Sequence, residues 1–120
     1  MELYQLTIQE AFDGLRKGRF SPSEILKSCL DRIKKFNSKL NVFLRVETIA
    51  SRSQNGALKN IPIAAKDMYL TKNITTTAAS HVLENYTPQY HATVIRNLLT
   101  NGDVLIGKTK IGRASCRERV

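Results

Sequence analysis

The sequence predicts an α/β protein in which N-terminal helices precede the first strands of a mixed sheet. Three observations lead to this fold class. Apolar residues recur at helical spacing over 7–35, two short apolar segments at 61–65 and 104–109 are typical of buried strands, and a helical pattern at 93–99 lies between those segments. Because strand, crossover helix and strand follow one another, the two strands are expected to pair in parallel.

The N-terminal third predicts two amphipathic helices. Residues 7–17 begin with Thr7 as a candidate N-cap and Glu10 three positions later, the spacing of a capping box, and Gly18 ends the pattern. A second start follows in SPSE at 21–24, where serine is the cap, proline takes the first helical position and glutamate completes another box. The apolar stripe of this helix consists of Ile25, Leu26, Cys29, Leu30 and Ile33. Two short helices joined by a tight turn are therefore expected.

The middle of the chain changes to strand-like patterns. NVFLRV at 41–46 is short and rich in β-favouring residues, so we expect a strand there, followed by a brief helix or turn around 47–52 and a polar connection over 51–60. IPIAA at 61–65 is apolar on both faces, which predicts a strand covered on two sides. TTTAAS at 75–80 predicts a loop or a helix cap.

The last third predicts a crossover helix and a second buried strand. The helix covers 93–99 and ends at Asn101-Gly102, and VLIGKT at 104–109 forms the strand. Two strands that need cover on both faces require more chain than this, because the helices present could cover one face at most. The sequence thus has the character of the opening of a larger α/β domain, here truncated.

Composition places the chain among ordinary globular proteins, with 120 residues, of which 42% are apolar and 24% charged. No apolar run approaches the roughly 20 residues that span a bilayer, and the N-terminus lacks a secretory signal, so we expect a cytosolic protein without membrane contact. The net charge of +9 is spread over separate clusters without interleaved aromatic residues, which disfavours a nucleic-acid surface. A non-catalytic basic interaction module, or a piece that contacts RNA, is kept as an alternative.

Metal and nucleotide sites are not predicted. Cys29 and Cys116 are far apart, and His81 and His91 do not supply the other ligands of a zinc site. We therefore interpret Cys29 as a small buried apolar residue and both histidines as surface residues. GKT at 107–109 has a glycine five residues before its Gly-Lys pair, as a phosphate loop requires, but the residues between are strand-like. A strand that ends in a turn is the better interpretation.

One lysine stands out because it ends an apolar strand. Lys66 follows IPIAA directly, so it is either a surface residue just past the strand end or a buried amine kept for chemistry. A lysine that acts as a base needs a pKa well below about 10.4, which burial or neighbouring dipoles can supply. The apolar segment before it is compatible with burial. Spacing and composition alone leave both interpretations open.

The order of four motifs resembles the amidase signature family. NIPIAAKD, TKNITTTAAS, LENYTPQYHATV and GDVLIGKT follow one another here as GIPIAIKD, TKGI-TTAAS, LEN-PPYDATV and GA-ILGKTN do in that family. Together with the leading helices, the similarity extends over residues 3–109 and is closest to the A subunits of tRNA-dependent amidotransferases. There are departures: Asn60 stands where glycine is usual, His91 stands where an acidic residue is common, and the connection before Asn60 is short.

The resemblance implies a catalytic role for Lys66. In that family the lysine after IPIA belongs to a Ser–cis-Ser–Lys triad, in which neutral lysine accepts a proton through a bridging serine so that a second serine attacks an amide carbonyl. Both serines are expected downstream of this chain, and Ser80 has no nucleophile role in the pattern. Lys66 is therefore the one catalytic residue expected in the chain, which by itself should be inactive.

The resemblance also implies a reaction, partners and cofactors. The A subunits of that family hydrolyse glutamine and supply ammonia for converting Glu-tRNA(Gln) or Asp-tRNA(Asn) to Gln-tRNA or Asn-tRNA. The partners are the B and C subunits, glutamine, and charged tRNA through the complex. No cofactor is expected in this subunit, while the whole complex uses ATP and Mg. The implied location is cytoplasmic, or mitochondrial or plastid for a eukaryotic source. Another amidase of the same family that hydrolyses a small amide is the alternative.

The C-terminal residues depart from the family pattern, which continues GKTNMDEF. IGRASCRERV at 111–120 can be encoded by DNA that resembles a common sequencing-library adapter, and the two adapter bases before it would turn an asparagine codon into that of Lys110. We therefore expect an amidase signature segment over 1–109 and read-through that is not native over 110–120. The alternative is a genuine arginine-rich tail with a free Cys116.

Overall fold

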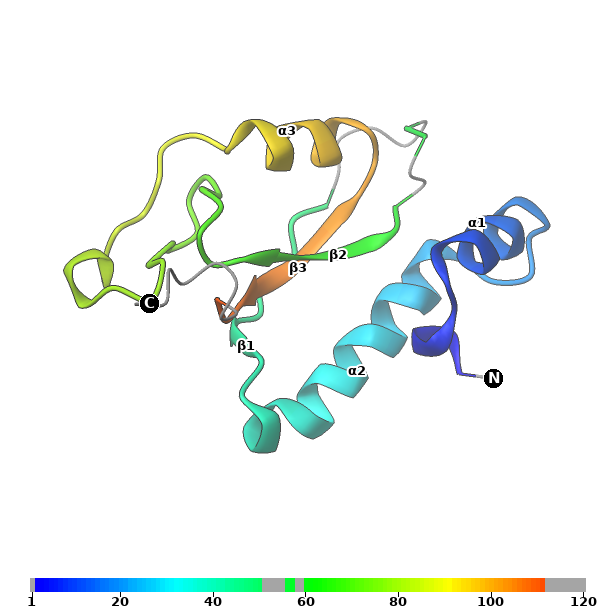
Figure 1. Cartoon of the computed structure of the whole chain (residues 1–120). Coiled ribbons are helices and arrows are strands. Elements are labelled where there is room, and N and C mark those ends of the chain that lie inside the picture. Colours follow the sequence, from blue (N-terminus) through cyan, green and yellow to red (C-terminus); the bar gives the residue numbers. More distant parts are fainter. Residues whose placement is uncertain (1, 51–55, 58–59, 112–120) are drawn as a thin grey trace, which may run out of the picture.

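The computed structural model describes residues 2–50, 56–57 and 60–111, and Figure 1 shows their arrangement. The elements in chain order are the 3-10 helix η1 (Leu3–Gln5), α1 (Ile8–Arg16), α2 (Pro22–Leu40), β1 (Phe43–Arg45), β2 (Pro62–Lys66), the 3-10 helix η2 (His81–Leu83), α3 (Thr93–Thr100) and β3 (Val104–Thr109). The two N-terminal helices, the crossover helix and the three strands expected from the sequence are present, and η1 and η2 are additions.

Both N-terminal helices begin with the predicted capping boxes. The hydroxyl of Thr7 accepts the backbone N–H of Glu10 at 3.3 Å, while the Glu10 carboxylate accepts the N–H of Thr7 at 2.8 Å. Ser21 and Glu24 repeat the arrangement at 3.3 and 2.6 Å. The N–H groups that face these carboxylates favour their charged forms, so the pKa of each glutamate is lowered.

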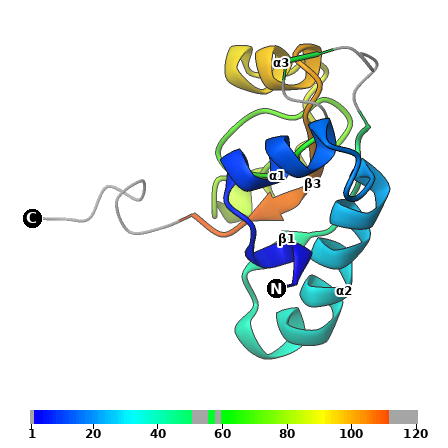
Figure 2. The same cartoon turned by 90° about the vertical axis from the view of Figure 1, so that its right-hand side faces the viewer.

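The strands form a mixed three-stranded sheet in the order β1-β3-β2. β2 and β3 run parallel, with Ala65 opposite Lys108 and Lys66 opposite Thr109, and β1 pairs with β3 in the antiparallel sense. The predicted parallel pair is thus confirmed, with α3 as its crossover helix. Figures 1 and 2 show α3 on one side of the sheet and α2 on the other.

Two apolar clusters hold these layers together. One lies between α3 and the sheet and is built from Ala65, Ile74, Ile95 and Leu105. The other lies where the N-terminal helices meet the start of β2 and is built from Ala11, Ile25 and Ile61, with Cys29 packed against it. Cys29 packs against apolar residues, as expected, but it is half-buried rather than fully buried. Its partial burial raises the pKa of its thiol.

The two apolar strands differ in how completely they are covered. Residues 104–108 of β3 are all buried, as predicted, because β3 is the central strand. In β2, Ala65 is buried but Ala64 is exposed, so the expectation of cover on two sides is wrong for this strand. The physical reason is that the part of the chain that the structure describes leaves the face of β2 that carries Ala64 open to solvent.

The segment after β1 is extended, and the expectation of a brief helix or turn around 47–52 is wrong for its described part. Ile49 forms an antiparallel bridge to Leu105, with backbone hydrogen bonds of 2.8 and 3.0 Å. Residues 51 and 52 lie outside the described residues. Gly107 explains how closely β1 approaches β3, because a Cβ atom there would stand 2.3 Å from the carbonyl oxygen of Arg45.

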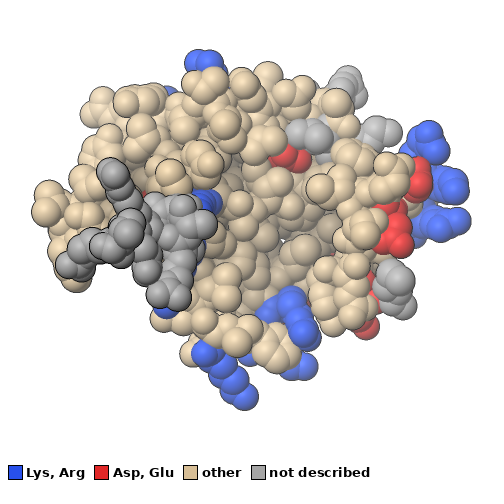
Figure 3. All heavy atoms as spheres, in the orientation of Figure 1, with Lys and Arg blue, Asp and Glu red and all other residues tan. Residues whose placement is uncertain are grey.

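The surface carries its charges in separate groups. Figure 3 shows Lys and Arg side chains at several edges of the viewed face rather than in one continuous stripe. None of the helices in the described part of the chain has the length and apolar character needed to cross a membrane. The expectations for Cys116 and for 112–120 concern residues outside those that the structure describes.

Candidate functional site

The carboxyl ends of the two parallel strands lie side by side. β2 ends at Lys66 and β3 at Thr109, which are partners in the ladder, and the N–H of Asp67 donates to the Thr109 carbonyl at 2.9 Å. Ligands of open α/β sheets bind outside this edge, because the strands end there and the loops that leave them carry polar groups. We therefore expect the functional site at these carboxyl ends of β2 and β3, which we call the carboxyl edge.

Lys66 lies at this edge, at the end of its strand as the sequence predicts. Its side chain is half-buried, and its backbone carbonyl accepts the N–H of Tyr69 at 3.0 Å in a tight turn. Its Nζ makes no hydrogen bond or ion pair to another residue that the structure describes. The amine is thus uncommitted within the described residues, and its catalytic role stays a prediction.

Asp67, the next residue, is a buried carboxylate that joins three parts of the fold. Its Oδ1 lies 3.3 Å from Nη1 of Arg45 in β1, and its Oδ2 accepts the backbone N–H and the hydroxyl of Thr77 at 3.2 and 2.5 Å. Its carbonyl accepts the N–H of Ala78 at 2.9 Å. A charge that is fully desolvated needs such partners. Asp67 therefore fixes the 75–80 loop against the strand ends.

The 75–80 loop has a strained backbone where Asp67 holds it. Ala78 and Ala79 have φ values of 48° and 57°, in the left-handed region. For residues with a Cβ atom this conformation costs about 1–2 kcal/mol each, so the surrounding contacts must hold it. The segment is a loop, in agreement with the sequence, and it contacts Asp67 at the carboxyl edge.

A second lysine near this edge is fully buried. Lys108 of β3 donates hydrogen bonds from its Nζ to the carbonyl oxygen of Tyr69, to the hydroxyl of Thr71 at 2.8 Å and to the hydroxyl of Thr76 at 3.2 Å. Burial lowers the pKa of Lys108 to about 8, while the carboxylate of Asp67 acts in the opposite direction. The three oxygen acceptors around Nζ match the three N–H donors of an ammonium ion.

Sequence reasoning missed Lys108, which it treated only as part of a rejected phosphate loop. The interpretation of 107–109 as strand is confirmed, since these residues form the end of β3. A signal for the buried amine was present. A lysine inside a segment predicted to be a buried strand needs several oxygen partners, and hydroxyl residues at 71 and 75–77 could supply them.

The two histidines have different environments. His81 is exposed, as expected, whereas His91 is half-buried and its Nδ1 accepts the backbone N–H of Lys72 at 3.0 Å. Burial and then the charge of Lys72 lower the pKa of His91. His91 thus lies at the surface as expected, but the loop after β2 packs against it and covers it in part.

Two hollows accompany the site. One, of about 450 Å³, is lined in part by Arg45, Thr77 and Ser80 at the carboxyl edge. The other, of about 900 Å³, lies beside α3 and is lined in part by Lys72 and His91. Within the described residues, no group of three or more His, Cys, Asp or Glu side chains is placed to hold a metal ion.

Comparison with known proteins identifies the family. The family model described as Amidase matches residues 24–115. The chain belongs to the amidase family. The relatives of this amidase chain include the A subunit of glutamyl-tRNA(Gln) amidotransferase from Granulibacter bethesdensis, 39% identical over 91% of the chain and 24% of that protein, and the protein of the same name from Halothermothrix orenii, 40% identical over 92% and 24%.

Solved structures agree with the fold. The crystal structure of the A subunit of glutamyl-tRNA(Gln) amidotransferase from Thermotoga maritima superposes on this amidase chain with a TM-score of 0.72 and 30% identity, over 91% of the chain and 24% of that structure. A protein from a complex related to an s-triazine catabolic enzyme has a TM-score of 0.73 at 17% identity over 89% of the chain and 26% of that structure, which shows the fold alone. The chain spans about a quarter of the length of the curated relatives that it matches. The predicted fold, truncated relative to these proteins, is confirmed.

Proposed function

We propose that this chain is the N-terminal part of the A subunit of a tRNA-dependent amidotransferase, which hydrolyses glutamine and supplies the ammonia that converts Glu-tRNA(Gln) or Asp-tRNA(Asn) to Gln-tRNA or Asn-tRNA. The observation that carries the proposal is the identity of 39–40% to curated A subunits, which extends over more than nine tenths of the chain. The arrangement of the carboxyl edge is compatible with it.

Lys66 is proposed as the base of the reaction. In a Ser–cis-Ser–Lys triad the lysine takes up the proton that the nucleophilic serine releases through the bridging serine, and backbone amides stabilise the oxyanion. Two observations favour Lys66 over Lys108 for this task. The Nζ of Lys66 has no partner among the described residues, whereas all three donors of Lys108 are already bonded.

The remaining parts of the machinery belong to the whole protein and its complex. Both triad serines would lie beyond residue 109, so the chain alone is proposed to be inactive. The B and C subunits, charged tRNA, ATP and Mg would serve the complex, and this subunit would bind glutamine without a cofactor of its own. The proposed location is the cytoplasm, or an organelle for a eukaryotic source.

The test uses the full-length protein, which we define as the polypeptide encoded by the source locus that contains residues 1–109. Sequencing the locus past Thr109 provides it and also tests whether 110–120 are native. The expected result is that the full-length protein releases ammonia from glutamine and that Lys66→Ala lowers the rate to background. Retained turnover in this variant would remove Lys66 from the mechanism.

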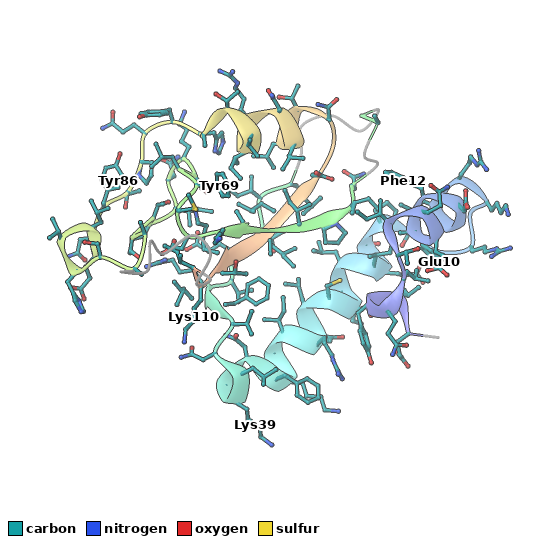
Figure 4. All side chains as sticks on the ribbon, in the orientation of Figure 1. Glu10, Phe12, Lys39, Tyr69, Tyr86 and Lys110 are labelled. Carbon is teal, nitrogen blue, oxygen red and sulfur yellow. The ribbon has the colours of Figure 1, made fainter. Side chains whose placement is uncertain are left out.

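The matched control is Lys39→Ala. Lys39 is exposed, and Figure 4 shows it at the end of α2 with its side chain directed away from the sheet. Its removal should leave the rate unchanged. Parallel assays with small amides that lack the glutamine α-amino and α-carboxyl groups distinguish the alternative amidase: hydrolysis of those amides without hydrolysis of glutamine would overturn the proposed substrate.

A further inference from the structure

We infer that Lys108 is a positioning residue, whose buried ammonium anchors the loop that leaves Lys66 and thereby fixes the backbone at the catalytic edge. The inference rests on the proposed function only for its kinetic readout. The anchored loop comprises residues 67–77. Its attachment to β3 can be measured by amide hydrogen exchange, without any substrate.

Besides the ladder between β2 and β3, Tyr69 connects the two lysines. The N–H of Tyr69 donates to the carbonyl oxygen of Lys66 at 3.0 Å, and the carbonyl oxygen of the same Tyr69 accepts a hydrogen bond from Nζ of Lys108. Figure 4 shows Tyr69 on the loop beside the end of the sheet. Any movement of the Lys108 ammonium therefore transmits to the turn that closes on Lys66.

The two threonines fit an ammonium donor in particular. The hydroxyl of Thr71 donates to the Tyr69 carbonyl at 3.1 Å, and the hydroxyl of Thr76 donates to the Ile74 carbonyl at 3.2 Å. Each hydroxyl has thus used its single hydrogen, so toward Lys108 it can only accept. A lysine supplies three donors and no acceptor, which is the complement that these three oxygens require.

Burial makes this anchor specific. Lys108 and Thr71 are fully buried and Thr76 is 2% exposed, so water does not replace the bonds while the loop is in place. The charged groups that act on Lys108 are the carboxylate of Asp67, from the loop, and the guanidinium of Arg45, from β1. Asp67 holds the far end of the same loop through Thr77, so the loop is fixed at both ends by buried charges.

A positioning role differs from a catalytic one in what it predicts. Because the Lys108 ammonium is committed to backbone and threonine oxygens, it is not available to take up a proton from a serine. Its loss should instead let the turn after Lys66 shift, and displacements of about 1 Å at a catalytic group can lower a rate about 100-fold. Substrate binding would be affected less than turnover.

The experiment is Lys108→Met in the full-length protein, which keeps side-chain volume and removes the donors. We expect kcat for glutamine to fall about 100-fold, calculated per folded molecule, with KM within about twofold. Amide hydrogen exchange in 69–78 should accelerate at least about tenfold, while amides of α1 and α2 keep their rates. Lys39→Met is the matched control and should change neither.

A second pair of variants keeps the inference testable if Lys108→Met does not fold. Thr71→Val removes one acceptor at nearly constant shape, and Thr71→Ser retains it. We expect faster exchange in 69–78 and a lower kcat for the valine variant, with both restored toward wild type in the serine variant. The positioning role would be overturned if the valine and serine variants had the same exchange rates and kcat. It would also be overturned if Lys108→Met kept the wild-type loop exchange and kcat.

Failure of the proposed function is recognised separately. If the full-length wild-type protein releases no ammonia from glutamine, the function is wrong, and the exchange measurement alone then decides the anchor. Acceleration confined to 69–78 would support it. Unchanged exchange, or acceleration spread evenly over the fold, would contradict it.

Discussion

Two lysines on neighbouring strands of the same sheet have opposite environments. Lys66 ends the edge strand β2, is half-buried and has no partner for its Nζ among the described residues. Lys108, one residue before the end of the central strand β3, is fully buried and bonds to three oxygens. The two residues are nearly level in the parallel ladder, since Lys108 pairs with Ala65.

The difference shows that the position of each lysine in the sheet, rather than the local sequence pattern, decides its burial. Both lysines follow apolar residues in sequence, so the local pattern does not separate them. β3 has a strand on each side and is covered on both faces, whereas β2 has an open edge. An amine on β3 must therefore be satisfied inside the protein, whereas the amine at the end of β2 has no partner among the described residues.

The largest expected effect is on local stability after truncation of each lysine. Lys108→Ala leaves the oxygen of Tyr69 and two threonine hydroxyls without their donor and creates a cavity, so we expect the free energy of opening of 69–76 to fall by about 3 kcal/mol. Lys66→Ala should change it by less than about 0.5 kcal/mol. Native-state hydrogen exchange of the full-length protein measures both values, and equal losses would abolish the contrast.

The pH dependence of stability sharpens the same contrast. The pKa of Lys108 is lowered from 10.5 to about 8 by burial, with Asp67 acting to raise it and Arg45 to lower it. Between these values the unfolded chain holds a proton that the folded chain has lost, so this residue makes stability rise with pH from about 8 to 10.5. The rise should be on the order of 3 kcal/mol.

Thermal unfolding of the full-length protein and its Lys108→Met variant tests this. The melting temperature of the wild type, minus that of the variant, should increase as the pH rises from about 8 to 10.5. A constant difference would mean that the Lys108 amine titrates normally and is not desolvated in the folded protein.

Two aspartate–arginine pairs among the described residues extend the comparison from lysines to carboxylates. Asp67–Arg45 and Asp13–Arg16 have nearly equal distances of 3.3 and 3.4 Å, but the Asp67 side chain is 0% exposed and that of Asp13 is 40% exposed. We expect Asp67→Asn to lower the free energy of opening of 75–80 by about 2 kcal/mol, because the Thr77 bonds lose a charged acceptor.

Asp13→Asn is the control and should cost less than about 0.5 kcal/mol, because water and salt screen an exposed pair. Hydrogen exchange at the amides of Thr77 and Ala78 measures the cost of Asp67→Asn, and exchange at the amides of α1 measures the cost of Asp13→Asn. Similar costs for the two variants would show that burial does not separate these pairs.

Much of the fold was predictable because local chemistry determines it. The capping boxes at Thr7 and Ser21 fix the helix starts, and the limits of β3 match the predicted segment. The errors concern segments whose structure depends on distant partners. Ile49 is extended because it pairs with Leu105, 56 positions later in the chain, and no pattern local to 47–52 encodes that bridge.

The site was less predictable than the fold for the same reason. The end of the strand at Lys66 follows from sequence, but the network around Asp67 and Lys108 joins residues that lie 10 to 39 positions apart. Which of two lysines is buried depends on strand order, and strand order is a property of the sheet rather than of either strand. From the sequence, the 75–80 segment could be predicted only as a loop. That its threonine hydroxyls bind Asp67 and Lys108 follows from the fold.

The smallest expected effect concerns a residue just before the edge strand, where the chain departs from the family pattern. Asn60 stands where glycine is usual, and its φ of 63° lies in the left-handed region. Its N–H donates to the carbonyl oxygen of Gly102 at 2.7 Å, which ties the start of β2 to the start of β3. Asparagine tolerates this conformation better than other residues with a Cβ atom, so it suits the backbone at this position.

Substitution at Asn60 separates this backbone requirement from any role of its side chain. Asn60→Gly should change stability by less than about 0.5 kcal/mol, whereas Asn60→Ala should cost about 1 kcal/mol because alanine is strained at this φ. Asn97→Ala, in the helical backbone of α3, is the control and should cost nothing or stabilise slightly. Hydrogen exchange at the β2 amides measures all three. A loss in Asn60→Gly as large as in Asn60→Ala would mean that the amide side chain, and not the left-handed backbone, holds the start of the strand that carries Lys66.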